Sequence, residues 1–196
     1  MGQRVARESI GQKSAGNREE VQFCVFSTAS GWLGLAGRNG RVCGLMLGHA
    51  DRQTVIDQAA SMYGDSWRQS DWAPELAARL QAYFHGAVDD FADIKLDLPE
   101  STAFQVAVRK AVRAIPYGQT ATYAEIARRA GTPRAARGVG GVMASNRIPI
   151  LIPCHRVVAS GGRLGGFSAP RGVDLKRWLL EREAEGLADV AGSPCE

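Results

Sequence analysis

The sequence predicts an α+β protein. A small N-terminal α/β domain, with an antiparallel sheet and helices, precedes a mostly helical, winged-helix-like domain with a helix-turn-helix. Three observations predict this: short apolar runs separated by turn residues come first, amphipathic helical patterns follow residue 98, and the charge balance reverses between the halves. With 196 residues, 45% hydrophobic and 22% charged, the chain can form one or two packed cores, unlike a disordered protein.

The N-terminal domain, residues 21–98, is expected to begin with a sheet. Asn39-Gly40 lies between two apolar runs and predicts a hairpin, because both residues tolerate positive φ. Ser30-Gly31 separates the preceding pair of runs. The three expected strands are Val21–Ser27, Trp32–Ala36 and Arg41–Leu47.

Two helices are expected after the sheet. The first runs from about Arg52 to Met62, with Asp51 as its N-cap. The second begins at Pro74, a favourable first-turn residue, and ends before Gly86. Its apolar stripe consists of Leu76, Leu80, Tyr83 and Phe84.

The second domain, residues 99–186, begins after a further strand predicted at Asp93–Leu98. Leu98-Pro99-Glu100 marks the boundary. Ser101 or Thr102 could cap the next helix, which Pro116-Tyr117-Gly118 ends. The apolar face of this helix consists of Phe104, Val108, Val112 and Ile115.

Two short helices joined by a glycine turn then predict a helix-turn-helix. Thr122 and Glu125 form a capping box that opens the first helix, and Gly131 closes it. Thr132 is expected to cap the second helix, residues 133–145, with Pro133 at its first position.

This second helix contains three glycines, although glycine costs about 1 kcal/mol in a helix interior relative to alanine. They are Gly138, Gly140 and Gly141. Close packing of another helix is one explanation. The other is close approach of the backbone to the minor groove of DNA, with Arg137 reaching in. Further along, Ser160-Gly161-Gly162 predicts a hairpin or wing.

Charge is distributed unevenly along the chain. Residues 101–180 contain 13 basic and two acidic residues, whereas residues 21–100 contain six basic and ten acidic ones. Of the 24 cationic residues, 20 are Arg, whose planar fork binds two oxygens at once. A polyanionic partner for the second domain explains this pattern better than solubility alone. The acidic N-terminal domain is expected to serve as a scaffold.

The chain is expected to act inside the cell. No apolar run approaches the ~18 residues of a membrane span. The polar first 20 residues, expected to be a mobile leader, lack a secretory signal. A cytoplasmic location follows, nucleoid-associated in a bacterium, and residues 187–196 are expected to be a tail. The cysteines lack CxxC spacing and are expected to be reduced thiols: Cys24, Cys43, Cys154 and Cys195.

Cys154 and His155 form the candidate reactive pair, reached through an apolar run, Ile148–Ile152, that is expected to be buried. A buried cysteine is commonly inert, whereas a thiolate becomes reactive near a base and a cationic field or helix N-terminus. Neighbouring side chains on a strand point to opposite faces. Either the backbone turns at this pair or a water joins the two side chains. A last helix is expected over about Val173–Ala184, and its Glu181 and Glu183 are candidates to orient His155.

The motif Pro153-Cys154-His155-Arg156-Val157 resembles the active-site motif of the O6-alkylguanine-DNA alkyltransferases. The similarity covers residues 101–185 strongly and is weaker in the N-terminal domain, where residues 82–85 carry it. The other matching pieces are Tyr117-Gly118, Tyr123, Arg134–Met143, Asn146, Ile150–Val158 and Phe167-Ser168.

The resemblance implies direct-reversal DNA repair with base flipping from the minor groove. Cys154 would accept an alkyl group from O6 of guanine, or O4 of thymine, irreversibly and once per molecule. His155 would act as a base through a water and would be oriented by Glu183. Tyr123 would donate to N3 of the leaving guanine, and Arg137 would fill the gap in the duplex.

The resemblance also implies the surrounding contacts. Asn146 would hold the turn before the reactive segment, and the carbonyls of Cys154 and Val157 would accept from the guanine amino group. The Ser168 amide would face O6, while Phe167 stands where many members have Tyr. The implied base pocket contains Met143, Val157, Phe167 and Ser168. The implied DNA contacts are Tyr123, Thr132, Arg134, Arg137, Gly138, Gly141 and Ser160.

No cofactor or metal is expected. His85 matches one zinc ligand of some members and Cys43 lies near another, but the remaining two of four ligands lack counterparts. The expected partner is double-stranded DNA containing O6-alkylguanine, bound by a monomer that could cluster side by side on DNA.

Two other functions fit parts of the pattern. The first is a DNA-binding module that recognises lesions or regulates transcription without chemistry, and the presence of Cys154 argues against it. The second is a thiol hydrolase that uses Cys154 and His155. A basic helix-turn-helix would have no role in such an enzyme.

Overall fold

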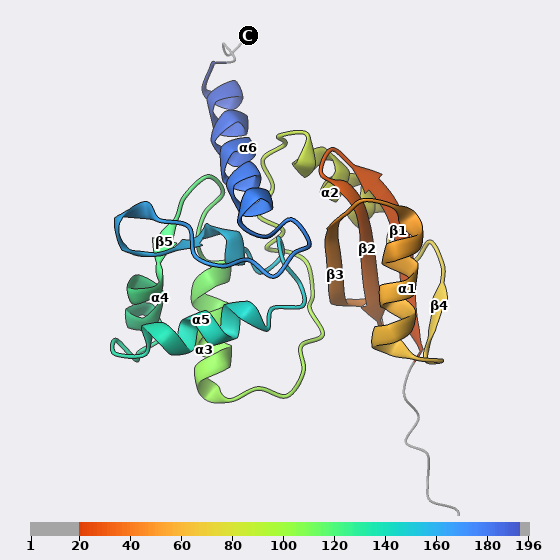
Figure 1. The fold of residues 1–196 in the computed structure, drawn as a ribbon, viewed down its shortest axis with the longest axis horizontal. Coiled ribbons are helices and arrows are strands. Elements are labelled where there is room, and N and C mark those ends of the chain that lie inside the picture. Colours follow the sequence, from red (N-terminus) through yellow and green to blue (C-terminus); the bar gives the residue numbers. More distant parts are fainter. Residues whose placement is uncertain (1–19, 193–196) are drawn as a thin grey trace, which may run out of the picture.

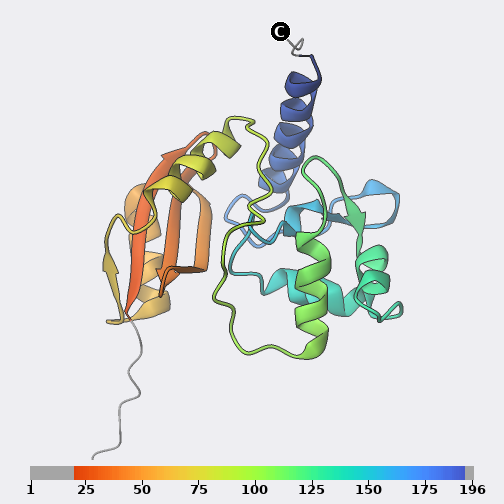
Figure 2. The same cartoon turned by 180° about the vertical axis from the view of Figure 1, so that it is seen from behind.

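The computed structural model describes residues 20–192, which form two units side by side, with a long C-terminal helix at their junction (Figure 1). The α+β class is confirmed. Seen from behind, the connection between the units runs as an extended chain between them (Figure 2). Residues 1–19 of the expected leader, and residues 193–196 with Cys195, lie outside the described residues.

The first unit is built on a four-stranded sheet in the order β3-β2-β1-β4. The strands are β1 (Val21–Thr28), β2 (Gly31–Arg38), β3 (Arg41–His49) and β4 (Trp67–Gln69). The first three are antiparallel neighbours, as predicted, and Asn39 and Gly40 adopt φ of 52° and 69° in the hairpin turn. The sequence pattern does not predict β4, which pairs in parallel with β1, because three residues are too few to show a period of two.

The strand expected at Asp93–Leu98 is wrong. Only Leu96 of this segment forms a bridge, with Val42 of β3. Further along the same edge, the Leu45 N–H donates to the carbonyl of Arg147 at 2.8 Å. The edge of β3 is therefore occupied by a segment from the second unit, and a longer strand cannot form there.

Helices cover both faces of this sheet. α1 (Arg52–Tyr63) packs on one face, and Asp51 caps it by accepting from the Thr54 N–H at 2.8 Å. α2 (Pro74–Phe84) lies on the opposite face. Both helices occur where they were expected. The core beneath α1 consists of Val21, Phe23, Ala36, Met46, Val55 and Ala59.

The core on the other face of the sheet joins the two units. It combines Leu33 and Leu35 of the sheet with apolar residues of α2. The second unit contributes Ile148, Ile150, Leu151, Leu175 and Leu179. Since these residues pack in one cluster, each unit completes the core of the other.

The second unit contains the predicted helix-turn-helix. Its helices are α3 (Ala103–Arg113), α4 (Tyr123–Arg129) and α5 (Ala136–Ala144). Thr102 caps α3, and the capping box of Thr122 and Glu125 opens α4 with both reciprocal hydrogen bonds present. The helices enclose a second core, which includes Val108, Val112, Ile126, Val139 and Val142.

The expected start of the last of these helices is wrong. α5 begins at Ala136, and residues 133–135 form a turn. Gly131 has φ of 75°, and the Thr132 N–H and hydroxyl both point back to the carbonyl of Ala127, at 2.9 and 3.5 Å. Thr132 therefore ends α4 and does not cap α5.

The remaining elements surround the reactive segment. They are β5 (Ala121–Thr122), η1 (Cys154–Arg156), β6 (Val157–Val158), η2 (Ser160–Gly162) and α6 (Gly172–Gly192). β5 and β6 pair in parallel. The segment expected to form a hairpin or wing contains the short 3-10 helix η2, and a hydrogen bond from the Ala159 N–H to the Arg163 carbonyl at 2.8 Å closes it.

The last helix is longer than its expected range of Val173–Ala184, and it continues through residues assigned to a tail. The added turns are packed: a side chain at Gly118 would collide with Leu187, and one at Gly186 would collide with the carbonyl of Gly86. Glycines at these two places let the end of α6 approach both units.

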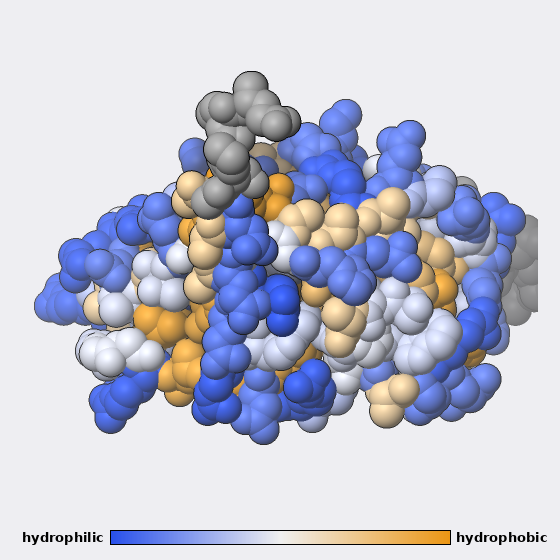
Figure 3. Space-filling view, turned by 90° about the horizontal axis from the view of Figure 1, so that it is seen from above, coloured by the Kyte–Doolittle hydropathy of each residue, from blue (hydrophilic) through white to orange (hydrophobic). Residues whose placement is uncertain are grey.

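The surface offers no broad apolar region in the view of Figure 3, where hydrophilic side chains alternate with smaller hydrophobic patches. None of the helices in residues 20–192 has the length and apolar character needed to cross a membrane. The large hydrophobic side chains exposed in this range are scattered: Met62, Val88, Leu98, Val106, Leu187 and Val190.

Candidate active site

Cys154 lies at the start of η1, at the end of a buried turn. The predicted burial of the preceding run is confirmed, but the run is not a strand: Ile150 has φ of 70°, and the Cys154 N–H donates to the carbonyl of Ile152 at 2.7 Å. The backbone therefore turns at Cys154 and His155, which was one of the two alternatives for this pair. The side chain of Cys154 is only slightly exposed.

Asn146 braces this turn from the end of α5. Its Nδ2 donates to the Ile152 carbonyl at 2.9 Å, and its Oδ1 accepts from the Ile148 N–H at 3.1 Å. Both ends of the loop are thus tied to one side chain. The structure places Asn146 between the helix-turn-helix and Cys154.

The thiol of Cys154 is held in its protonated form at rest. Burial raises its pKa, whereas Asn146 and the ammonium group of Lys176 lower it and are outweighed. Lys176 is fully buried, and its Nζ donates to the carbonyl of Val157 at 2.6 Å. Although a cationic group is present, as expected, Cys154 needs a base before it can react as a thiolate.

His155 is fully buried and oriented by a carboxylate. Its Nε2 lies 2.8 Å from Glu183 Oε1, while Glu181 is exposed on α6, so the structure selects Glu183 from the two candidates. Burial lowers the pKa of His155 more than Glu183 raises it, which favours the neutral imidazole. Its Nδ1 is buried and has no hydrogen-bond partner among residues 20–192.

Glu183 is the centre of a buried polar cluster. Arg156, 2% exposed, donates to both of its oxygens at 2.8–3.0 Å, and the Gly118 N–H donates to Oε2 at 3.0 Å. Tyr83 of α2 donates to Oε1. Burial raises the pKa of Glu183, but the hydrogen bonds and charges of His155 and Arg156 outweigh it and lower that pKa to about 2.

Sequence reasoning missed the roles of Tyr83, Arg156 and Lys176 in this cluster. Arg156 belongs to the reactive motif, and its place beside His155 was an available signal. Lys176 lies three positions before Leu179 on the same helix, and residues at that spacing share a helix face. Its burial could therefore be predicted from helical spacing. Tyr83 is indistinguishable from a core aromatic in the stripe of α2.

A cavity of about 420 Å³ opens beside Cys154. It is lined by Tyr123, Gly140, Met143, Ala144, Cys154, Gly166, Phe167 and Ser168. The predicted pocket residues Met143, Phe167 and Ser168 therefore meet at the predicted nucleophile. Val157 is buried behind this segment and does not line the cavity, and its carbonyl already accepts from Lys176.

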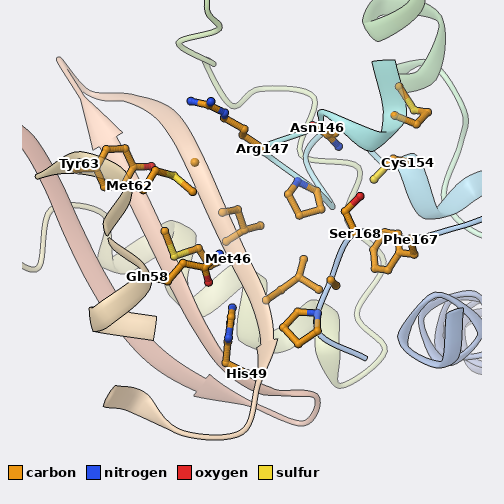
Figure 4. Close-up of a pocket in the computed structure, with 17 residues that line it drawn as sticks. Met46, His49, Gln58, Met62, Tyr63, Asn146, Arg147, Cys154, Phe167 and Ser168 are labelled. Carbon is orange, nitrogen blue, oxygen red and sulfur yellow. The ribbon is translucent and has the colours of Figure 1, made fainter. Parts of the chain in front are cut away.

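A second cavity, of about 150 Å³, also reaches Cys154 and lies between β3 and the reactive segment (Figure 4). Met46, His49, Gln58, Met62 and Tyr63 line it from the first unit, and Asn146, Arg147, Cys154, Phe167 and Ser168 from the second. Cys154 thus lies where the two units and two cavities meet.

Most of the predicted DNA contacts lie in the helix-turn-helix and outside the cavity beside Cys154, whereas Ser160 lies in η2 and Tyr123 lines the cavity. Arg134, Arg137 and Ser160 are exposed, and Thr132 is half-buried. Among the glycines of α5, a Cβ at Gly138 would lie 3.2 Å from Phe104, so close packing explains this one. A Cβ at Gly140 or Gly141 would meet no described atom within 4 Å, so packing does not explain them.

The cysteines and histidines elsewhere form no cluster. In residues 20–192, no group of three or more His, Cys, Asp or Glu side chains is placed to hold a metal ion. His85 is exposed at the end of α2. Cys24, Cys43 and Cys154 are free thiols.

Comparison with known proteins agrees with this architecture. The family model for the DNA-binding domain of 6-O-methylguanine DNA methyltransferase matches residues 103–185. The methylated-DNA–protein-cysteine methyltransferase of Methanosarcina acetivorans is 44% identical over 120 residues, which cover 61% of this chain and 74% of the relative. That of Haemophilus influenzae is 40% identical over 144 residues, covering 71% and 79%.

Solved structures match over nearly the whole chain. The crystal structure of Mycobacterium tuberculosis O6-methylguanine methyltransferase has a TM-score of 0.68 and 33% identity, covering 90% of this chain and 96% of that one. Mycobacterium tuberculosis OGT in complex with DNA has a TM-score of 0.68 and 35% identity, covering 84% and 94%. The fold, the matched domain and the relatives together show that the chain belongs to the methylated-DNA–protein-cysteine methyltransferases, enzymes of direct-reversal DNA repair that transfer an alkyl group to a cysteine.

Proposed function

We propose that Cys154 is the acceptor in this transfer, and that its Sγ takes the alkyl group from O6 of a guanine in duplex DNA, once per molecule. The observation that carries the proposal is the position of Cys154, which lines a cavity of about 420 Å³ and adjoins the buried His155–Glu183 pair. A cavity of a few hundred Å³ suits a group the size of a purine base.

Proton transfer begins the reaction. The thiol of Cys154 and the imidazole of His155 are both neutral at rest, and Nδ1 of His155 is buried without a partner among the described residues. This favours a water between Nδ1 and Sγ, because buried waters occupy sites with otherwise unsatisfied polar groups. Through that water His155 takes the thiol proton. Glu183 then stabilises the imidazolium.

Displacement follows in one step. A bond forms between Sγ of Cys154 and the alkyl carbon, the bond from that carbon to O6 breaks, and its electron pair passes to the guanine. Tyr123 lines the same cavity, and burial raises its pKa, which keeps its hydroxyl protonated. Its proton or hydrogen bond to N3 stabilises the departing guanine. The thioether product remains on the protein.

The reaction requires the base to leave the duplex, at a cost of a few kcal/mol. α5 supports this step, since Arg137 is exposed and Gly140 and Gly141 leave open space on the helix. We propose that this face enters the minor groove and that Arg137 occupies the gap left by the base. The remaining proposed contacts are Thr132, Arg134, Gly138, Gly141 and Ser160.

The proposed substrates are alkylated bases in DNA. Methyl and larger alkyl groups on O6 of guanine are the proposed lesions, with O4-alkylthymine as a second class. We propose that a monomer binds the lesion, in the cytoplasm if the source is a bacterium. The excess of basic residues in the second unit supports binding that weakens as salt rises.

Intact-mass measurement tests the acceptor. The protein is incubated with a duplex that contains one O6-methylguanine, and a gain of one methyl group, mapped to Cys154, is expected. Cys154→Ala should bind the duplex but gain no mass, and Cys43→Ala, which alters another free thiol, should react as the wild type does. An unmodified wild-type protein that still binds the lesion would refute the proposal and leave a binding module.

A further inference from the structure

Tyr83 is a buried phenol that the proposed reaction leaves without a role. It belongs to α2 of the first unit and is 1% exposed. Its ring packs edge-on against Phe84, Phe91 and Tyr117, with centroid distances of 5.6–5.8 Å. Phenylalanine would fill this apolar site equally well, so the hydroxyl needs its own explanation.

The hydroxyl of Tyr83 reaches the reactive segment of the second unit. It donates to Glu183 Oε1 and lies 3.3 Å from Nε2 of His155. The same Oε1 accepts from His155 Nε2 and from Arg156 Nη2, both at 2.8 Å. An ionised carboxylate only accepts. Tyr83 therefore donates its hydrogen bond to Oε1, and His155 carries its proton on Nε2.

This arrangement determines which nitrogen of His155 is basic. With the proton on Nε2, the lone pair of the neutral ring is on Nδ1, the atom that has no partner among residues 20–192. Tyr83 adds a hydrogen bond to Oε1 beside those of His155 and Arg156, which helps to hold the carboxylate against the imidazole. The orientation of the proposed base thus depends on a hydroxyl from the other unit.

We propose that Tyr83 is a positioning residue for alkyl transfer, which acts through Glu183 to hold His155 as the Nε2–H tautomer with Nδ1 free to take the thiol proton. The inference rests on the proposed function of Cys154 and His155. It also gives the first unit a part in the reaction beyond that of a scaffold, because α2 supplies a group to the cluster.

Removal of the hydroxyl should change the acidity of His155. The hydrogen bond from Tyr83 withdraws negative charge from Oε1. Without it, Glu183 stabilises an imidazolium more strongly, and the neutral, basic form of His155 becomes dominant only at higher pH. The other groups that face His155 are unchanged in such a variant: Cys154, Arg156, Lys176 and Glu183.

The variant Tyr83→Phe tests this, with Tyr117→Phe as its matched control. Tyr117 touches the ring of Tyr83, and its hydroxyl donates to the Gly86 carbonyl at 3.3 Å, so the control also removes one hydroxyl from the same aromatic cluster. Single-turnover rate constants with an O6-methylguanine duplex are measured between about pH 5 and pH 9, which brackets the titration of histidine. The dissociation constant for the duplex is measured alongside.

Tyr83→Phe should lower the rate constant at least about fivefold at pH 7 and move the midpoint of the rising limb to higher pH by about half a unit or more. Its affinity for the duplex should stay within about twofold of the wild type, and Tyr117→Phe should match the wild type in both respects. Equal effects of the two substitutions, or an unchanged midpoint, would overturn the inference.

A measurement on the wild-type protein covers the case in which Tyr83→Phe fails to fold. Nitrogen-15 spectra of the histidine rings should show His155 as the neutral Nε2–H tautomer at pH 7. Observation of the Nδ1–H tautomer would refute the positioning role. If the wild type leaves Cys154 unmethylated, the proposed function fails, whereas normal methylation with equal behaviour of the two Tyr variants refutes only the inference about Tyr83.

Discussion

Substitution of Glu183 by Gln removes the negative charge that balances Arg156 in the buried cluster around Glu183. Glu183 and Arg156 are 1% and 2% exposed, and the two side chains share hydrogen bonds of 2.8–3.0 Å. Glutamine keeps the shape of the side chain, but its NH₂ group replaces one acceptor oxygen. A donor of the cluster would then face another donor. Breaking a buried ion pair on one side costs about 3–5 kcal/mol, because the other charge stays buried and unpaired.

The pKa of Glu183 gives a second measure of the same interaction. The fall from 4.5 to about 2 in the folded protein corresponds to about 3 kcal/mol of stability. The folded pKa lies below the unfolded one, so this stability is present above about pH 5 and is lost as the pH falls from 4.5 toward 2. About 2 kcal/mol of it should be gone at pH 3.

Urea unfolding at pH 7 and pH 3 compares the wild type, Glu183→Gln and Glu181→Gln. Glu181 lies on the same helix but is exposed, so it serves as the control. The difference in unfolding free energy between the wild type and Glu183→Gln should be about 3–5 kcal/mol at pH 7 and smaller by about 2 kcal/mol at pH 3. A difference that does not change with pH, or an equal loss in Glu181→Gln, would refute the reasoning.

Three further predictions concern DNA binding and the base. Arg137→Ala should slow repair of O6-methylguanine in duplex DNA at least about tenfold more than it slows reaction with free O6-benzylguanine; equal losses in both rate assays would contradict a role in base extrusion. Since burial lowers the pKa of His155, the single-turnover rate constant should be flat at neutral and higher pH and fall only below the ordinary histidine pKa of about 6.5. A midpoint above that ordinary value would contradict the neutral resting imidazole. Gly141→Ala should raise the unfolding free energy by up to about 1 kcal/mol, because a Cβ at this position meets no described atom within 4 Å. Gly141→Glu should weaken the affinity for the duplex. Unchanged affinity in Gly141→Glu would show that α5 is not part of the DNA interface.

Local signals in the sequence were sufficient for most of the fold. Asn39-Gly40 predicted the hairpin between β2 and β3, Thr102 was one of two candidate caps for α3, and the capping box of Thr122 and Glu125 located α4. One failure occurred where a distant segment competes for the same backbone groups. Residues 93–98 form no strand because the edge of β3 also pairs with Arg147, which no local pattern reveals.

In the candidate site, too, some residues carry a local sequence signal and others do not. Cys154 and His155 could be predicted from a short motif, and the resemblance to a known family singled out Glu183 from two candidate glutamates. Tyr83 could not, since its hydroxyl meets Glu183 across 100 positions of sequence and its ring looks like part of a core stripe. The pKa of Cys154 was also beyond the sequence, because burial outweighs the cationic group only once both are placed.

A buried, protonated thiol suits a protein that is consumed by its own reaction. The thiolate is the reactive form of cysteine. A raised pKa therefore keeps Cys154 from reacting with stray alkylating agents or oxidants while no flipped guanine occupies the cavity. In the proposed mechanism, the reaction requires a proton path from Cys154 to His155 and an alkyl carbon in line with Sγ, and binding of the lesion supplies the alkyl carbon. The buried Glu183 cluster holds His155 in place, so the proton path is available at all times. Under this proposal, selectivity for damaged DNA follows from controlled access to a latent nucleophile, and a permanently ionised cysteine at this position would shorten the working life of each molecule.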